Sequence, residues 1–460
     1  MLPAKVRELM MPGRLAALRQ MVRFLASKGV FGPDALQDGL NSKKYKTLSP
    51  GEGSGPAPSL FRDFLFVPPF TVPFSVTVNV SGGGAALQAA VIAAAAGTRL
   101  LITDSLNYSG VVFTGKTNIT IEAAAGQTPT ITAAAGQSQS AMRIGAGNSG
   151  IALKRLALIG NGNQNGLSQS DNGILLGTAA VTGMATFDRL IVDSCTFSEL
   201  NPALGVPGIQ LIGTNGLSHT DVWVKGCTFT DCSTPAFATG AGYGACTVGG
   251  FDLVVVQNSK ILRVAVARAA SHMRGVVLKN LDQLVQDVLC FDIGSAGSNE
   301  CFKHNDEAIF GTAVGNGNWK NCVAFNAKRA FRITLSGAGM KVSNATVYNA
   351  IPGVAVGQIL MRRDNAPTTF LIEACVIQGA GDGTAFSATA VENHNDVFNV
   401  AAPGKVLDPT DLTVDPMLSA PIVNDYRATD PSVATGGLTP GTPMGVAYPG
   451  GDVIVWAGVP

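Results

Sequence analysis

Residues 189–197 (RLIVDSCTF) and 221–229 (DVWVKGCTF) share one pattern of apolar, turn-forming and small residues. In each stretch two apolar residues flank a position that accepts any residue. Two turn residues, a cysteine, another free position and a phenylalanine follow. Alternation with a period of two indicates a short strand with one buried face. The pattern therefore predicts two short strands that meet at a two-residue bend.

The same pattern occurs nine times in the chain. The copies begin at Asn118, Gly150, Arg189, Asp221, Leu253, Gly275, Gly317, Gly339 and Thr369. The residue after the bend is small or apolar in every copy, and these residues are Ala124, Leu156, Cys195, Cys227, Ser259, Leu281, Cys322, Ala345 and Cys375. Consecutive copies are 22 to 41 residues apart, whereas a propeller or an antiparallel sandwich would need hairpin turns at regular spacing.

These intervals indicate a coil rather than a set of hairpins. A coil of three short strands closes in roughly 20 residues, and longer repeats leave loops between the strands. We therefore predict an all-β fold, a single-stranded right-handed parallel β-helix with an N-terminal α-helical arm and a capping helix. Successive coils of such a fold stack about 4.8 Å apart, so equivalent positions lie above one another.

Stacking gives the repeated cysteines a structural interpretation. The predicted core stack contains Cys195, Cys227, Cys322 and Cys375, because cysteine is small enough to fill a column of the interior. No histidine lies in register with them, and no CxxC pair is present. We therefore predict no metal, no cofactor and no disulfide scaffold.

The composition excludes several classes of protein. Charged residues make up 14% of the 460 residues, against roughly 25% in an ordinary soluble protein. The 32 basic and 31 acidic residues leave a net charge of +1, which provides no global field for nucleic acid or for an anionic membrane. The longest apolar run, within residues 85–102, is too short to cross a bilayer. We expect neither nucleic acid nor a membrane as a partner.

The N-terminal arm carries an excess of positive charge, whereas the rest of the chain has more acidic than basic residues. Residues 1–50 contain nine basic and three acidic residues, and the apolar spacing over residues 1–40 predicts a basic helical arm. Its predicted docking residues are Arg14, Leu15, Leu18, Arg19, Val22 and Arg23. A solvated basic helix without a partner is the alternative. Residues 41–80 are predicted to form a Pro/Gly-rich linker and a first strand, residues 81–437 the β-helix, and residues 438–460 a C-terminal tail.

Two segments carry a family resemblance. The stretch from Leu87 to Ile121 contains an Ala-rich helix, a strand, a bend at Tyr108 and the first full coil, and it resembles the opening of pectate-lyase-like right-handed β-helix proteins. Asp415-Pro-Met and Asn424-Asp-Tyr-Arg resemble the closing segment of that superfamily. The resemblance implies the fold over roughly residues 80 to 440. It does not specify an activity, since the superfamily includes lyases, hydrolases, epimerases and phage tail spikes.

The densest polar cluster of the sequence offers the only weak catalytic candidates. The cluster consists of Glu300, His304, Asp306 and Glu307, and the candidates His304, Asp306 and Glu307 combine a histidine with two carboxylates, which suits acid–base chemistry at neutral pH. A solvated surface loop over residues 301–307, between coils, explains the same residues equally well. We therefore assign no catalytic residue from the sequence.

These features together favour a structural protein over an enzyme. No signal peptide is visible, so synthesis in a host cytoplasm, a docking arm and a β-helical body predict a structural bacteriophage virion protein. It would be a head-decoration, fibre or tail-spike protein. Its predicted partners are other virion proteins of the capsid or tail, further copies of the chain in a homo-oligomer such as a trimer, and a host-surface polysaccharide. The alternative function is a lyase or hydrolase that degrades host capsule.

Overall fold

The computed structural model describes residues within the range 71–446. The described ranges are 71–133, 141–144, 147–160, 174–176, 188–199, 209–212, 221–230, 232, 244–263, 273–279, 282–292, 299–304, 316–334, 340–350, 352, 354–364, 370–420, 425–438 and 442–446. The predicted arm (residues 1–40), with all its docking residues, and residues 41–70 of the predicted linker lie outside them.

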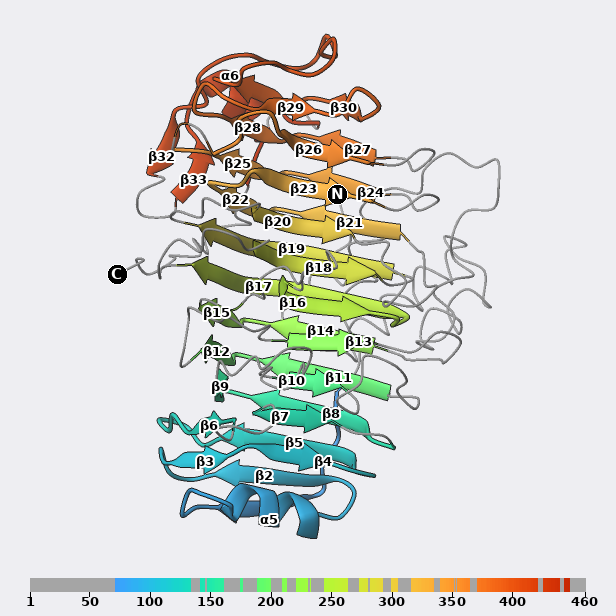
Figure 1. Cartoon of the computed structure of the whole chain (residues 1–460), viewed down its shortest axis with the longest axis vertical. Helices are drawn as coiled ribbons and strands as arrows, with labels where there is room; N and C mark the ends of the chain where they lie inside the picture. The colour runs from blue at the N-terminus through green and yellow to red at the C-terminus, as the bar shows by residue number, and fades with distance from the viewer. Residues whose placement is uncertain are drawn as a thin grey trace, which may run out of the picture. The chain divides into compact units, whose positions relative to one another are not determined.

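The described strands form a stack of rungs in sequence order (Figure 1). Each of the ten complete rungs contributes three strand segments, and each segment pairs in parallel with the equivalent segment of the next rung. The first two segments of every rung belong to a 21-stranded sheet, and the third belongs to a ten-stranded sheet. The fold is therefore mostly β, with long parallel sheets, as the repeat predicts.

The 21-stranded sheet, called here the first sheet, has two columns of segments. Its first column consists of β1 (Val76–Val80), β2 (Thr98–Ile102), β5 (Thr117–Ala123), β8 (Ser149–Lys154), β11 (Asp188–Asp193), β14 (Asp221–Lys225), β17 (Leu253–Arg263), β19 (Asp282–Asp292), β21 (Asn316–Lys320), β24 (Met340–Ser343), β27 (Phe370–Glu373) and β30 (Val391–Asn393). Its second column consists of β3 (Asn107–Ser109), β6 (Thr130–Thr132), β9 (Ala157–Gly160), β12 (Thr196–Glu199), β15 (Thr228–Thr230), the second halves of β17 and β19, β22 (Val323–Phe325), β25 (Thr346–Tyr348), β28 (Val376–Gln378) and β31 (Asp396–Phe398).

The ten-stranded sheet is called here the second sheet. It consists of β4 (Val111–Phe113), β7 (Met142–Ile144), β10 (Ile174–Leu176), β13 (Ile209–Ile212), β16 (Gly244–Gly249), β18 (Met273–Lys279), β20 (Asn299–His304), β23 (Arg329–Ile333), β26 (Ile359–Arg363) and β29 (Thr384–Phe386). Outside the rungs lie the helices α5 (Ala86–Ala93) and α6 (Pro431–Thr435) and an antiparallel pair, β32 (Leu418–Ala420) and β33 (Asp425–Ala428).

A left-handed corner joins the two columns of the first sheet. One residue per rung has a positive φ, between 48° and 60°, and these residues are Arg155, Ser194, Gly226, Asn258, Asp287, Asn321, Asn344, Ala374 and His394. The first eight directly precede the small or apolar position of their rung, whereas His394 precedes the buried Asn395. Asn, Asp, Ser and Gly dominate because their side chains tolerate this conformation or because they lack a Cβ.

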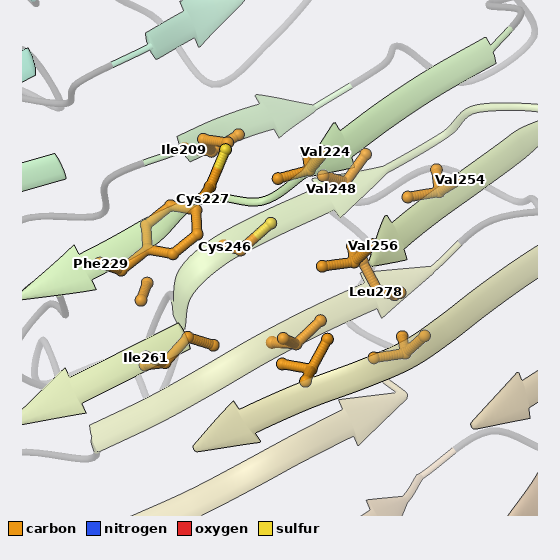
Figure 2. Close-up of a cluster of buried hydrophobic side chains, with 14 of the residues drawn as sticks. Ile209, Val224, Cys227, Phe229, Cys246, Val248, Val254, Val256, Ile261 and Leu278 are labelled. Carbon is orange, nitrogen blue, oxygen red and sulfur yellow. The ribbon is translucent and has the colours of Figure 1, made fainter. Parts of the chain in front are cut away.

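The rungs fill their interior with like residues. Cys195 and Cys227 lie on neighbouring rungs, and the backbone nitrogen of Thr228 donates to the oxygen of Cys195 at 3.0 Å. Figure 2 shows Cys227, Phe229 and Cys246 pointing into the space between the two sheets. These residues belong to one continuous hydrophobic cluster that runs through the described rungs. Stacked rings such as Phe197 over Phe229, with centroids 4.6 Å apart, extend the columns.

Two of the nine predicted copies are wrong in their details. The copy at Gly275 belongs to β18 of the second sheet, and the corner of that rung is Asp287, followed by the buried Val288. The first copy places its small residue at Ala124. In the second copy, the backbone oxygen of Leu156 accepts a hydrogen bond from the nitrogen of Thr196 on the following rung. In the first copy the equivalent bond, from the nitrogen of Ala157, is accepted by Pro129 and not by Ala124. That first bend is therefore several residues longer than the pattern predicts.

Both ends of the stack are covered by described residues. At the first end α5 buries Leu87 and Val91 against the core, and it lies beside β2 in Figure 1. At the other end residues 405–415 bond to the last rung, where the nitrogen of Val397 donates to Leu412. Residues 442–446 return to the side of the first sheet, where the nitrogen of Gly445 donates to Ala374 and Val446 joins the cluster around Phe291 and Phe325. This described part of the predicted tail packs against its own chain.

Candidate functional site: a basic ladder on the second sheet

The most highly charged part of the second sheet lies on β20, β23 and β26. Phe302, Phe331 and Met361 pair in register on these strands and are fully buried in the core. The residues after them are Lys303, Arg332 and Arg362, which are also in register. Because neighbouring residues of a strand face opposite sides, all three point away from the core. Lys303 is nevertheless buried, at 3% exposed, whereas Arg332 and Arg362 are partly exposed. We call these three residues the basic ladder.

Glu300 connects Arg332 of the basic ladder to a further arginine, Arg329. Its side chain is 1% exposed, and Oε1 accepts hydrogen bonds from Arg329 Nη1 at 2.8 Å and from Arg332 Nη1 at 2.5 Å. Glu300 pairs with Arg329 across the strands, whereas Arg332 lies three residues further along the same strand. One carboxylate therefore fixes two guanidinium groups on the next rung. Such charge-assisted bonds are among the stronger ones in proteins.

Asp364 connects the next two members of the ladder. Its carboxylate accepts from Arg332 Nε at 2.6 Å and also from Arg362 Nε. Burial alone would lower the pKa of Arg332, but the carboxylates of Glu300 and Asp364 outweigh burial and raise the pKa above its ordinary value. Arg332 therefore stays cationic.

The cluster carries more positive than negative charge. Lys303, Arg329, Arg332 and Arg362 oppose two carboxylates, which leaves a balance of +2. Lys303 is buried, the three arginines of the cluster are partly exposed, and Arg362 is the most exposed of these three, at 31%. Partly dehydrated guanidinium groups held in fixed positions bind carboxylate or sulfate groups with defined geometry. The arrangement can therefore bind an anionic ligand along the stack.

The structure places the predicted catalytic candidates differently from the sequence interpretation. His304 is the last residue of β20, is 0% exposed and pairs in register with Ile333. The interpretation of residues 301–304 as a surface loop is therefore wrong, because Cys301 and Phe302 are core residues of a strand. Asp306 and Glu307 lie outside the described residues.

The cysteines of the core stack are buried thiols. Cys195, Cys227, Cys322 and Cys375 are fully buried and free, like the other four cysteines of the chain. Burial raises the pKa of Cys195 and of Cys375 to about 12, and it raises the pKa of Cys227 and Cys322 as well. A thiol that is not ionised is a poor nucleophile and a poor metal ligand. Within the described residues no group of three or more His, Cys, Asp or Glu is arranged to hold a metal ion.

The basic ladder and Asp364 were not predicted from the sequence, whereas Glu300 belongs to the polar cluster that was singled out there. A signal for the ladder exists in the sequence, because Phe302-Lys303, Phe331-Arg332 and Met361-Arg362 repeat an apolar residue followed by a basic one at intervals of 29 and 30 residues. Those intervals match the rung length. Without a bend motif beside them, the three pairs do not stand out from the surrounding loops.

Comparison with known proteins yields structural similarities at low sequence identity. A PL6 family alginate lyase, AlyGC, matches with a TM-score of 0.37 and 14% identity over 65% of this chain and 40% of its own. The pectate lyase Pel9A matches with a TM-score of 0.39 and 13% identity over 82% and 90% of the two chains. A polygalacturonase from Erwinia carotovora ssp. carotovora matches with a TM-score of 0.28 and 11% identity over 75% and 96%.

These proteins are pectate and alginate lyases and a polygalacturonase with parallel β-helix folds. This chain spans about two fifths of the length of the alginate lyase. No known family matches the sequence as a whole, and no curated protein matches it either. Among the residues that the structure describes, no helix is both long enough and apolar enough to cross a membrane.

Proposed function

We propose that this chain binds an acidic polysaccharide along the outer face of the second sheet. The observation that carries the proposal is the register of Lys303, Arg332 and Arg362 on three consecutive rungs. Equivalent residues of neighbouring parallel strands are about 4.8 Å apart, so Arg332 and Arg362 present one partly exposed cation per rung, and the buried Lys303 continues the row beneath the surface. A linear polymer with one carboxylate per sugar unit matches such a row better than a compact anion does.

Local charge rather than total charge supports the proposal. The chain as a whole carries a net charge of +1, so it has no general attraction for polyanions. The balance of +2 is confined to the cluster around Glu300 and Asp364, where fixed carboxylates orient the guanidinium planes. Orientation of this kind favours specific over diffuse binding.

Calorimetric titration of the full chain with polygalacturonate tests the proposal, with dextran as the uncharged control. We expect binding of polygalacturonate that weakens as salt concentration rises, and no binding of dextran. Equal binding of both polymers, or binding of neither, would remove the basic ladder as a site for acidic sugars.

Cleavage of the bound polymer is the alternative within the same site. Glu300 and Asp364 each accept from two arginines, so neither is placed as the free proton donor that glycoside hydrolysis needs. We therefore favour binding over hydrolysis. Assays for new reducing ends and for unsaturated ends in the titrated mixture distinguish hydrolysis and elimination from binding alone.

The role in a bacteriophage particle is a separate proposal. It depends on the basic arm, residues 1–40, which would dock the chain onto a capsid or tail while the β-helix faces a host polysaccharide. Deletion of residues 1–40 should leave polygalacturonate binding intact and abolish incorporation into particles. Assembly as a homo-oligomer such as a trimer belongs to the same proposal.

The handedness of the coil is a further proposal. Parallel crossovers within one sheet are right-handed in nearly all proteins, which supports a right-handed coil.

A further inference from the structure

The last rung of the stack, β30 and β31, is closed by residues 405–415, called here the closing segment. The nitrogen of Leu412 donates to Asn395 at 2.7 Å, and the nitrogen of Val397 donates to Leu412 at 3.0 Å. Asp396 and Leu412 form an isolated parallel bridge. Few backbone bonds therefore attach the closing segment to the rung.

Carboxyl groups make several further contacts of this seam, beside the Thr410 hydroxyl, which accepts from the nitrogen of His394, and Lys405 Nζ, which donates to the oxygen of Ala390. Asp411 Oδ1 accepts from the nitrogen of Asn395 at 2.7 Å, and Asp396 Oδ1 accepts from the nitrogen of Val414 at 3.1 Å. Glu392 Oε1 accepts from the nitrogen of Asp408 at 3.2 Å. Three acidic side chains thus hold the closing segment to the last rung from both sides.

These carboxyl groups are buried with little compensation. Asp396 is fully buried and the side chain of Glu392 is 1% exposed. The second oxygen of each, Oδ2 of Asp396 and Oε2 of Glu392, is buried without a hydrogen-bond partner. An ionised carboxylate in such a place carries a large desolvation cost, whereas a protonated one does not.

The charged groups around the seam are mostly acidic. Asp396 faces Asp415 and Asp430, of which Asp430 caps α6. Asp411 contacts Glu392, and its Oδ2 accepts from the backbone of Asp408. The basic side chains are Lys405, whose Nζ lies 3.0 Å from Glu392 Oε1, and His394, which lies near Asp408.

Protonation offsets this accumulation of negative charge. Burial raises the pKa of Asp396 to about 7, with Asp430 and Asp415 adding to the effect. Burial, together with the neighbouring Glu392, also raises the pKa of Asp411 to about 7. A raised pKa stabilises the closed seam fully below the unfolded value of 3.8, and that contribution is lost as pH rises through about 7.

We propose that the closing segment is a pH-sensitive closure of the last rung, which opens when the carboxyl groups of the buried Asp396 and the half-buried Asp411 lose their protons. Opening would free the backbone groups of Val397 on β31 and of Asn395 just before it, which the closing segment now occupies. A free parallel edge at the end of the stack can pair with another strand. The closure would therefore couple pH to exposure of that edge.

Hydrogen exchange of the full chain at pH 5 and pH 8, corrected for the intrinsic rate, tests the closure. The amides of Val397, Leu412 and Val414 should lose protection at pH 8, with opening more frequent by roughly tenfold or more. The amide of Thr346, which bonds to Cys322 inside the stack, should not change. Equal protection of the seam amides at both pH values would overturn the proposal without recourse to any variant.

Substitutions identify the groups responsible. Asp396→Asn and Asp411→Asn each keep an oxygen acceptor but cannot ionise, so each should reduce the loss of protection at pH 8. Asp408→Asn is the matched control in the same segment. Hydrogen bonds from Thr410 lower the pKa of Asp408, so its titration lies below pH 5 and the control should respond as the unmodified chain does. An unchanged response in both test variants would assign the effect to other groups and overturn the proposal.

Discussion

Asn321 donates a hydrogen bond from its side-chain amide to the carboxylate of Asp287, the residue at the same left-handed corner of the preceding rung. Their φ angles are 53° and 55°. The bond shows that residues 34 positions apart in sequence are direct neighbours along the stack. Corners of this kind set the register of the rungs, since a residue suited to the bend must recur once per coil.

The conformation of the corner can be tested where packing does not interfere. Asn258 has a φ of 48° and its side chain is exposed. Asn258→Val should lower the free energy of unfolding by about 2 kcal/mol, because a β-branched residue is strained in this region. Asn258→Gly, the matched control, should be nearly neutral. Urea unfolding measures both, and a neutral valine variant would contradict the assigned conformation.

The cysteine column leads to a chemical prediction. All eight cysteines are free and buried, and burial raises the pKa of Cys195 to about 12. The folded chain should therefore not react with a thiol reagent at pH 8, whereas the chain in urea should expose eight reactive thiols. Absorbance of the released chromophore gives both counts. Rapid labelling of the folded chain would mean that the column is not closed.

Burial should decide how much two similar ion-pair clusters contribute to stability. Glu300 and Glu122 each bind two arginines, but the side chain of Glu300 is 1% exposed and that of Glu122 is 11% exposed. Glu300→Gln leaves two partly buried arginines without their carboxylate and should cost about 3 kcal/mol. Glu122→Gln should cost about 1 kcal/mol. Thermal unfolding of both variants tests this order, and a larger loss for Glu122→Gln would contradict it.

The return of residues 442–446 to the first sheet depends on a glycine. A Cβ on Gly445 would lie 2.8 Å from Val376 Cγ2 and 2.9 Å from Thr346 Oγ1, and the φ of Gly445 is 75°. Gly357 has a similar φ of 67° and no atom within 4 Å of such a Cβ. We expect Gly357→Ala to cost about 1 kcal/mol from backbone strain alone. Gly445→Ala should cost clearly more in the same thermal unfolding assay, and equal costs would place residue 445 away from the sheet.

The stacked rungs were predictable from the sequence because the first sheet marks its corners. Ser194-Cys195 and Gly226-Cys227 each combine a residue in the left-handed conformation with a small core residue. Because this pair of residues recurs once per coil, the sequence shows where each corner lies. The segment that begins at Gly275 was wrongly matched to the repeat, because β18 is apolar and is followed by turn-forming residues as the first-sheet strands are. The true corner, Asp287-Val288, lies within an eleven-residue strand that has no glycine or asparagine at its bend.

The candidate site was less predictable than the fold. Lys303 and Arg332 become neighbours only through the pairing of β20 with β23, and loops of variable length separate these strands in sequence. The second sheet has no bend motif that marks its register. His304 is polar but buried, and it was considered as a weak catalytic candidate or as part of a surface loop because a single sequence does not show which side of a short strand is buried.

Binding of polygalacturonate by two arginine variants tests the central claim most directly. Arg362→Gln removes a charge from the basic ladder, whereas Arg155→Gln removes one from a corner of the first sheet, where Arg155 pairs with Glu122. We expect Arg362→Gln to weaken binding at low salt roughly tenfold, because a charge-assisted hydrogen bond contributes about 1.5 kcal/mol or more. Arg155→Gln should bind as the unmodified chain does. Equal affinities for the two variants would contradict the assignment of the ladder as the binding site.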